Sequence, residues 1–408
     1  MTPLSLLLAF LAFYPVVTGA AWMVGGVLFR VLEGRPDPAT PPGGWPGVTV
    51  LVPAYNEEQV IARCVTALRA LAYGGDLEIL ILNDGSADGT VAVARAAAGD
   101  DPRVTVLDDG VNLGKADRLN DGMRRARHDL VLVTDADTHL HPDAVRHLTT
   151  RILRSPRYAA VAGSPRVTNR GGVIPTLQML EAASLIGLMR RTHALAGRVG
   201  TVAGVLGLFR RDAVLAVGGY DPRMATEDIE LTWRLLEAGH LTGFAPHALV
   251  GMQVPGTLRS IWAQRTRWAR GQGEVLRTHA RTVVRPRHWA LWPIALEALL
   301  SYVWVLTMLV ATTWGVLHWI THPGDTRFRW MLAWGVGIAV VAVLQIALAI
   351  VVERRLDPRL PYACFLLPLY PLAYWSLNAL AALTSQTRGL LRGPRKKRVT
   401  WDLPRTPS

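Results

Sequence analysis

The chain has 408 residues, of which half are hydrophobic and only 18% are charged, an unusually apolar composition for a soluble enzyme. Its formal net charge is +13, with 44 Lys and Arg against 31 Asp and Glu. Many basic residues flank apolar segments, so a membrane explains the charge better than nucleic acid, and no nucleic-acid partner is expected. Two cysteines, Cys64 and Cys364, form neither a disulfide framework nor a metal-binding spacing.

Residues 1–33 predict an N-terminal transmembrane anchor. The stretch Leu4–Phe29 is almost wholly apolar and long enough to cross a bilayer. Small residues at 19–21 would also suit a cleaved signal peptide, but no basic residue precedes the apolar run. The first positive charges, Arg30 and Arg35, follow the run and place the next domain in the cytoplasm. A linker rich in Gly and Pro comes next.

From Val48 onward, apolar strands alternate with helical stretches. Strands are expected at Val48–Val52, Leu77–Leu82, Val104–Leu107 and Leu130–Thr134, with helices at Glu57–Leu71, Gly89–Ala98 and Lys115–Arg127 between them. This alternation predicts an α/β, Rossmann-like cytoplasmic domain with a mostly parallel sheet over residues 45–285. Two later amphipathic stretches, near 174–191 and 256–280, fit either core-facing helices or helices in the lipid interface.

A C-terminal transmembrane region is expected over residues 289–385. Its three apolar segments, each long enough to span, are Trp289–Ile320, Trp330–Val352 and Leu360–Leu383. Three such spans after one N-terminal span would put the basic tail, 386–408, outside, against the positive-inside tendency. Three prolines interrupt Leu360–Leu383, so this segment is the first candidate for a re-entrant or tilted path.

The acidic pair Asp135 and Asp137 follows the strand Leu130–Thr134 directly, separated by one alanine. In an open parallel sheet, ligands bind beyond the carboxyl ends of the strands. Two carboxylates at such an end suit a hard divalent cation held against a diphosphate. Asp-X-Asp alone is common and is more often a solvated turn, so the rest of the chain decides between the two interpretations.

Polar residues follow the three earlier strands as well. Tyr55 and Glu57 come after the first strand, where a helix start suits a nucleotide and Tyr55 could lie against a base. Asp84 follows the second strand and could accept from a base N–H or a ribose hydroxyl. Lys115 follows the third strand and could contact phosphate or uracil oxygens. Taken singly, these residues also fit a helix cap, a common Asp-Gly turn and a surface lysine.

Two further clusters lie closer to the C-terminal segments. Glu227 and Asp228 begin a helix, where carboxylates stabilise the helix dipole or, near an acceptor, take a hydroxyl proton. Gln264, Arg267 and Trp268 form a Gln-X-X-Arg-Trp cluster just before the apolar region. Arg267 could pair with a diphosphate and Trp268 could stack on a sugar, although an Arg-Trp pair also suits a membrane surface.

Together these clusters resemble the processive family 2 glycosyltransferases, which include cellulose, chitin, hyaluronan and poly-β-1,6-N-acetylglucosamine synthases. The family order D, DxD, TED and QxxRW is matched by Asp84, Asp135-Ala136-Asp137, Thr226-Glu227-Asp228 and Gln264-Arg265-Thr266-Arg267-Trp268. The resemblance covers roughly residues 1–385 and is closest to the bacterial poly-β-1,6-N-acetylglucosamine synthases, through the Thr226–Ile229 and Arg267–Val275 stretches. Arg270-Gly271-Gln272-Gly273 departs from the Gly-Gly pair expected there.

This resemblance implies a GT-A type fold and the polymerisation of N-acetylglucosamine from UDP-N-acetylglucosamine. The implied donor site is Tyr55, Glu57, Asp84, Lys115 and Asp135; the Mg²⁺ or Mn²⁺ ligands are Asp137 and Asp135; the acceptor end is Gln264, Arg267 and Trp268. Asp228, with Glu227 beside it, would be the catalytic base, and its proton transfer must accompany attack because a free Asp has a pKa of about 4. The implied partners are the growing polysaccharide, the lipid bilayer of the cell membrane and a small membrane subunit.

Other readings stay open from the sequence. The product could be a chitin-, hyaluronan- or cellulose-like polymer, or a single sugar on a lipid carrier, although the Gln-X-X-Arg-Trp motif goes with polymerising members. A receptor or transporter without catalysis would leave the ordered carboxylates unexplained. Such a protein would show no metal-dependent affinity for UDP, which makes that binding the discriminating observation.

Overall fold

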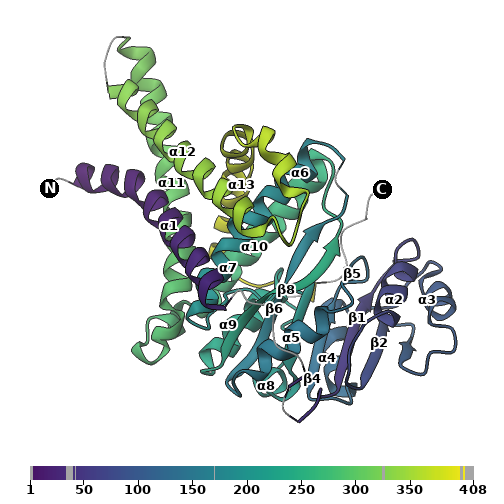
Figure 1. Cartoon of the computed structure of the whole chain (residues 1–408). Coiled ribbons are helices and arrows are strands. Elements are labelled where there is room, and N and C mark those ends of the chain that lie inside the picture. The colour runs from purple at the N-terminus through teal and green to yellow at the C-terminus, as the bar shows by residue number, and fades with distance from the viewer. Residues whose placement is uncertain are drawn as a thin grey trace.

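The structure, a computed structural model, describes residues 3–33, 40–41, 43–169, 171–323, 327–395 and 398–399. It consists of a helix-covered sheet domain and a group of long apolar helices that lie together on one side of it (Figure 1). Arg35, the rest of 34–39 and residue 42 of the expected linker, and the end of the basic tail fall outside the described residues.

The sheet domain is built on eight described strands in the order β3-β2-β1-β4-β7-β6-β8-β5. They are β1 (Val48–Ala54), β2 (Leu77–Asn83), β3 (Val104–Leu107), β4 (Leu130–Thr134), β5 (His139–Leu140), β6 (Tyr158–Val167), β7 (Leu206–Arg210) and β8 (Leu241–Met252). The four predicted strands pair in parallel, as expected. Beyond β4 the sheet is mixed, because β7 runs antiparallel to both β4 and β6, and β5 runs antiparallel to β8.

Both faces of this sheet are covered by helices, which is why its central strands are continuously apolar. The covering helices are α2 (Ile61–Arg69), α3 (Thr90–Ala98), α4 (Lys115–Arg125), α5 (Ala144–Leu153), α8 (Arg211–Ala216) and α9 (Glu227–Glu237). Successive strand residues point to opposite faces. Val50 and Val52 of β1 therefore pack in one core with α2, whereas Leu51 packs in a second core with Leu119 of α4.

Within the part of the chain that the structure describes, three helices are long and apolar enough to cross a membrane: α1 (Pro3–Glu33), α11 (Trp292–Thr321) and α12 (Arg327–Glu353). The expected third C-terminal span is divided instead into η3 (Leu360–Leu366), η4 (Tyr370–Tyr374), α13 (Trp375–Ala381) and η5 (Ala382–Gln386), followed by α14 (Thr387–Arg392). Pro361 and Pro371 lie in the first turns of η3 and η4, where a missing N–H is tolerated, and from 369 to 392 the α- and π-helical turns follow one another without a break. Among the described residues of the C-terminal region, only α11 and α12 are long and apolar enough to span a membrane.

The two amphipathic stretches form helices between the sheet domain and the long helices. The first is α6 (Val173–Glu181), continued by the π-helical η1 (Ala182–Leu188) and by α7 (Met189–Leu195). The second is α10 (Leu258–Val283), which a 3₁₀ turn, η2 (Pro286–Leu291), joins to α11. Helix α7 packs on α1, and α10 packs on η5 and α14, so both connect the two halves of the molecule (Figure 1).

Ion pairs fasten the ends of two long helices to the sheet domain. Glu353, the last residue of α12, is 1% exposed and pairs with Arg166 of β6 and Arg191 of α7. Glu33, the last residue of α1, pairs with Arg151 and Arg154 at the end of α5. These contacts place the two helix ends directly against the sheet domain.

The end of the described chain also returns to the sheet domain. The backbone N–H of Arg395 donates to the carbonyl of Arg223 at 3.2 Å, and that of Val399 donates to the carbonyl of Pro222 at 2.7 Å. Arg398 lies 3.1 Å from Asp117 of α4. The basic tail therefore begins on the same side of the long helices as the sheet domain.

Candidate active site

The loops after β1 and β2 are tied together at the carboxyl edge of the sheet. The backbone N–H of Asn56 donates to Ser86 Oγ at 3.0 Å, and Ala87 N–H donates to Asn56 Oδ1 at 2.9 Å. The backbone N–H of Glu57, a buried residue, donates to Thr90 Oγ1 at 2.7 Å. Tyr55 is half-buried at the start of this loop. The structure thus places Tyr55 and Glu57 beside the loop that carries Asp84.

The Asp84 carboxylate accepts hydrogen bonds from backbone N–H groups of the protein itself. This carboxylate is fully buried and accepts from the N–H groups of Leu113 and Gly114, at 2.8 and 2.9 Å, and from Arg118 Nε at 3.2 Å. The two N–H groups belong to the segment that leads into Lys115, and Arg118 lies in the first turn of α4, so Asp84 fixes the start of this helix. Its predicted contact with a nucleotide stays a prediction, and it would require some of these donors to be exchanged.

Four charged residues meet where β4 ends and where α4 and α9 begin. Lys115 Nζ lies 2.6 Å from Asp135 Oδ1 and 3.9 Å from Glu227 Oε1. The backbone N–H of Gly204, just before β7, lies 3.4 Å from Asp228 Oδ2. The Cβ atom of any side chain at Gly204 would lie 3.1 Å from Lys115 Nζ, so the glycine leaves room for the lysine. Residues up to 113 positions apart in the sequence, Lys115 to Asp228, thereby form one site.

The electrostatics of this site follow from its burial. Burial and the neighbouring Asp228 raise the pKa of Glu227, while Lys115 and Arg267 act in the opposite direction. For Lys115, burial lowers the pKa, but the charges of Asp135, Glu227 and Asp228 outweigh it and raise the pKa above its usual range. The lysine therefore stays cationic, and Glu227 is the carboxyl group whose proton is held more tightly than usual.

The loop that carries Asp135 and Asp137 is fixed by two threonines. Thr138 Oγ1 donates to the carbonyl of Asp135 at 2.7 Å and lies 2.8 Å from Thr134 Oγ1. Among the residues that the structure describes, no group of three His, Cys, Asp or Glu side chains could enclose a metal. Two carboxylates nevertheless fit Mg²⁺ or Mn²⁺, which take most other ligands from water and phosphate. Because Lys115 occupies one oxygen of Asp135, Asp137 is the better candidate ligand.

The Gln-X-X-Arg-Trp cluster lies on α10. Arg267 is exposed, yet it is close enough to Glu227 to affect that carboxyl group electrostatically. The Oε1 atom of Gln264 is buried and has no hydrogen-bond partner among the described residues. Trp268 is half-buried. A buried acceptor without a donor is costly, so this amide is suited to receive a hydroxyl from a ligand.

Close packing joins α10 to the start of α9. Gly271 lies against Thr226, and a methyl group at Gly271 would overlap the threonine side chain. Glu274, fully buried, accepts from the backbone N–H of Ala225 at 2.9 Å. Gly273 lies against the backbone of η5 and α14 on the other side. Both glycines of the Arg-Gly-Gln-Gly stretch thus have a packing role, and the motifs on α9 and α10 are packed directly against each other.

Two residues that the sequence analysis did not select lie at this site. Arg190 of α7 is buried, donates to the carbonyl of Gly163 at 3.2 Å, and has a pKa lowered to about 10 by burial, against the opposing charge of Asp228. Cys64 Sγ lies 3.8 Å from the carbonyl of Asp135, and burial raises its pKa, so it remains a thiol. No local pattern indicated either residue, because their positions depend on how α7 and α2 pack.

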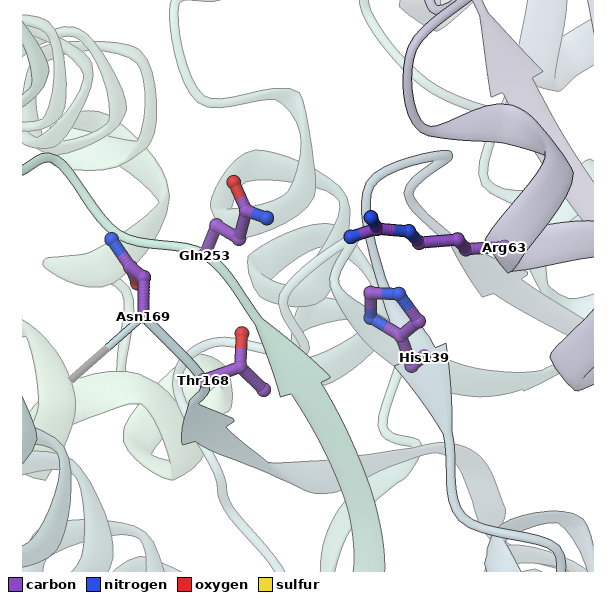
Figure 2. Close-up of a pocket in the computed structure, with 5 residues that line it drawn as sticks. All are labelled: Arg63, His139, Thr168, Asn169 and Gln253. Carbon is purple, nitrogen blue, oxygen red and sulfur yellow. The ribbon is translucent and has the colours of Figure 1, made fainter. Parts of the chain in front are cut away.

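A cavity of about 380 Å³ lies beside the Asp-Ala-Asp loop. One of its lining residues, His139, follows Asp137 by two positions. The cavity is lined by Arg63, His139, Thr168, Asn169 and Gln253. Figure 2 shows the side chains of Arg63 and His139 directed toward the same space. Thr168 Oγ1 donates to the carbonyl of Met252, and Asn169 Nδ2 donates to that of Val254. These two polar groups hold the ends of β6 and β8 together, and none of the predicted site residues lines the cavity.

Comparison with known proteins agrees with this geometry. The family "Glycosyltransferase like family 2" matches residues 46–271. The poly-beta-1,6-N-acetyl-D-glucosamine synthases of Staphylococcus aureus and Staphylococcus epidermidis are 32% and 29% identical to the chain over 405 and 407 residues, with 97% of each chain covered.

A solved structure of a mannosyltransferase from Pyrobaculum calidifontis, in complex with GDP-Man and Mn²⁺, is similar with a TM-score of 0.65 at 21% identity, covering 92% of this chain and 98% of the other. This similarity confirms the expected GT-A type fold, in which a mixed, partly parallel sheet carries the site at its carboxyl edge. The chain belongs to glycosyltransferase family 2 and is a glycosyltransferase.

Proposed function

We propose that the chain is a membrane-embedded, processive, inverting glycosyltransferase that polymerises N-acetylglucosamine from UDP-N-acetylglucosamine into a β-1,6-linked exopolysaccharide. The observation that carries the proposal is the full-length identity of 32% with synthases of this polymer, which extends beyond the sheet domain into the long apolar helices. The meeting of Asp135, Glu227 and Asp228 around Lys115 supports it, because these three carboxylates belong to the DxD and TED motifs, which the synthase chemistry needs in one place.

In this proposal the donor lies across the carboxyl edge of β1, β2 and β4. Tyr55, Glu57 and Asp84 form its nucleotide end, with Asp84 acting through the segment that it holds. Asp137, assisted by Asp135, would hold Mg²⁺ or Mn²⁺, which when bound offsets the charge on the leaving diphosphate. Lys115 adds a fixed positive charge beside the same oxygens.

Asp228 is the proposed base. As an acceptor hydroxyl oxygen forms a bond to the anomeric carbon, the bond from that carbon to the diphosphate breaks and the hydroxyl proton passes to Asp228. Direct displacement converts an α-linked donor into a β-linked product. The N–H of Gly204, 3.4 Å from Asp228 Oδ2, orients the carboxylate. Glu227, whose pKa burial raises, is less suited to this role because it holds a proton more readily.

The acceptor end lies at α10, where Gln264, Arg267 and Trp268 face the motif of α9. Helix α10 leads through η2 into α11, so the acceptor end adjoins the proposed membrane spans (Figure 1). With α1, α11 and α12 spanning the cell membrane, both the sheet domain and the tail that contacts Arg223 lie on the cytoplasmic side. The growing polymer would then leave through the membrane region as it is made.

The deciding experiment supplies membranes that contain the full chain with radiolabelled UDP-N-acetylglucosamine and Mg²⁺ or Mn²⁺. The expected result is high-molecular-weight label that an enzyme specific for β-1,6-linked glucosamine polymer digests. Polymer that resists digestion would contradict the linkage, and label extracted with lipid would indicate single addition to a carrier. An absence of incorporation both alone and with a co-expressed small membrane subunit, while another UDP-sugar is incorporated, would overturn the donor assignment.

A further inference from the structure

We propose that Arg265 is a positioning residue: its guanidinium, held by Glu181 and Tyr374, fixes the Trp268 ring on which the acceptor sugar rests. The inference rests on the proposed function, which places the acceptor at Trp268. Arg265 lies between the residues of the Gln-X-X-Arg-Trp motif that were expected to touch substrate, but its own side chain is buried in the protein.

The guanidinium of Arg265 is held in a single plane. Its Nη1 and Nη2 atoms lie 2.9 and 2.6 Å from the two oxygens of Glu181 on α6, a bidentate pair. The hydroxyl of Tyr374, on η4, donates to Glu181 Oε2 at 2.8 Å and also contacts Arg265. The three residues are 5%, 6% and 2% exposed. A buried bidentate pair fixes both the position and the tilt of the guanidinium.

The fixed guanidinium in turn contacts Trp268. Arg265 and Trp268 are three positions apart on α10, so they share a helix face. The Arg265 Cζ atom lies 4.4 Å from the centre of the Trp268 ring and 5.3 Å from that of Tyr374. A cation over the indole covers part of the ring and opposes its rotation. Trp268 nevertheless remains half-exposed, which leaves ring surface for a sugar.

The cluster of Glu181, Arg265 and Tyr374 also joins three parts of the chain that are distant in sequence. Glu181 belongs to α6, Arg265 to α10, and Tyr374 to the interrupted stretch that follows α12. Tyr370 stacks on Tyr374 with ring centres 5.2 Å apart, which extends the contact along η4. The orientation of Trp268 therefore depends on how η4 packs against α10, and not on α10 alone.

The test is a double-mutant cycle on the full chain in detergent, with labelled UDP-N-acetylglucosamine and a β-1,6-linked N-acetylglucosamine oligosaccharide as acceptor. Arg265→Met with Glu181→Gln removes the pair without leaving a buried charge alone, a replacement that folded proteins tolerate. We expect kcat/KM for the acceptor to fall about a hundredfold, as for a misplaced binding group. The KM for the donor should stay unchanged. In a Trp268→Ala background, the same pair of substitutions should have little further effect.

Equal losses in both backgrounds, or no loss with Trp268 intact, would overturn the inference. Glu33→Gln with Arg151→Met is the matched control, since it removes the ion pair of another buried arginine, away from Trp268, and should act equally in both backgrounds. If the first variant does not accumulate, Arg265→Lys replaces it, because an ammonium keeps the charge but loses the planar fork. A wild-type chain that adds no N-acetylglucosamine would overturn the proposed function together with this inference, whereas an additive cycle with an active wild type overturns the inference alone.

Discussion

Lys115 Nζ lies 2.6 Å from Asp135 Oδ1, so an ammonium group occupies a carboxylate that the sequence assigns to metal and nucleotide binding. The same nitrogen is 3.9 Å from Glu227, and Asp228 adds to the local negative charge. Lysine thus compensates a cluster of acids that would otherwise repel an incoming diphosphate. If the donor binds here as proposed, its phosphate oxygens would compete with Asp135 for this ammonium group.

Lys115→Met should therefore weaken the binding of UDP by roughly tenfold to a hundredfold, because one close charge pair in a partly buried site is worth about 1.5–3 kcal/mol. Calorimetric titration of UDP in the presence of Mn²⁺ measures the change. Arg124→Met removes a positive charge from an exposed part of the same helix and should leave the affinity unchanged. Equal affinities of wild type and Lys115→Met would show that the lysine is not near the donor.

Asp228→Asn and Asp137→Asn should separate catalysis from donor binding. The first removes the proposed base and should abolish polymer synthesis while UDP still binds nearly normally. The second removes a proposed metal ligand and should weaken UDP binding only in the presence of the metal, which titrations with and without EDTA measure. Equal losses of donor binding in the two variants would contradict this division of roles.

Gly271→Ala should disturb the contact between α9 and α10, since the added methyl group would overlap Thr226. Overpacking of this kind costs about 1–3 kcal/mol. We expect a lower melting temperature in detergent and reduced polymer synthesis, because Thr226 precedes the proposed base by two residues. Gly256→Ala is the control, since a methyl group there meets nothing within 4 Å. Similar behaviour of both variants would argue against a tight contact between the helices.

His279 on α10 gives the stability of this contact a pH dependence. Burial lowers its pKa, but Glu230 and Glu237 on α9 outweigh burial and raise the pKa from 6.5 to about 9. Its Nδ1 lies 2.5 Å from Glu237, and its Nε2 lies 3.6 Å from Glu230, beyond hydrogen-bond distance.

Because the folded state binds this proton more tightly, the resulting stabilisation is complete below pH 6.5 and is lost as pH rises through about 9. The shift corresponds to about 3 kcal/mol. Melting temperatures measured from pH 6 to 10 should fall over this window in the wild type and less steeply in His279→Gln. A parallel fall in both proteins would assign the dependence to other groups.

A tag added after residue 408 should lie on the same side of the membrane as the sheet domain, because two C-terminal spans return the chain to the side it left. Protease protection of sealed inverted vesicles tests this, with a tag in the Thr321–Arg327 connection as the opposite-side control. Protection of the C-terminal tag in such vesicles would indicate that the stretch after α12 crosses the membrane as well.

The sequence predicted the part of the sheet that local patterns determine. Val48–Val52 and Leu130–Thr134 are apolar at every or nearly every position because helices cover both faces, so their strand character and crossovers could be read directly. The short strand β7, Leu206–Arg210, was not predicted. Its antiparallel direction depends on how the chain between β6 and β7 packs, and no local pattern encodes that path.

The residues of the candidate site could likewise be predicted only in part. Asp135, Lys115 and Asp228 could be selected because polar residues at strand ends and helix starts meet at one sheet edge. The role of Asp84 in holding the start of α4 could not be predicted. The sequence does not show that Arg118 and the N–H groups of 113 and 114 donate to its carboxylate. The placement of Arg190 likewise depends on the packing of α7 on the sheet.

The ion pairs of Glu33 and Glu353 have a consequence for motion. They bind the last residue of α1 to α5 and the last residue of α12 to β6 and α7, and Arg30 of α1 also donates to the carbonyl of Val352. If both helices span the bilayer, these pairs set how far the sheet domain stands from the hydrocarbon boundary. They also oppose rotation of either helix about its own axis. Advance of the product by one sugar would then have to come from displacements of the sugar and of nearby side chains, with the two helices acting as a stationary frame.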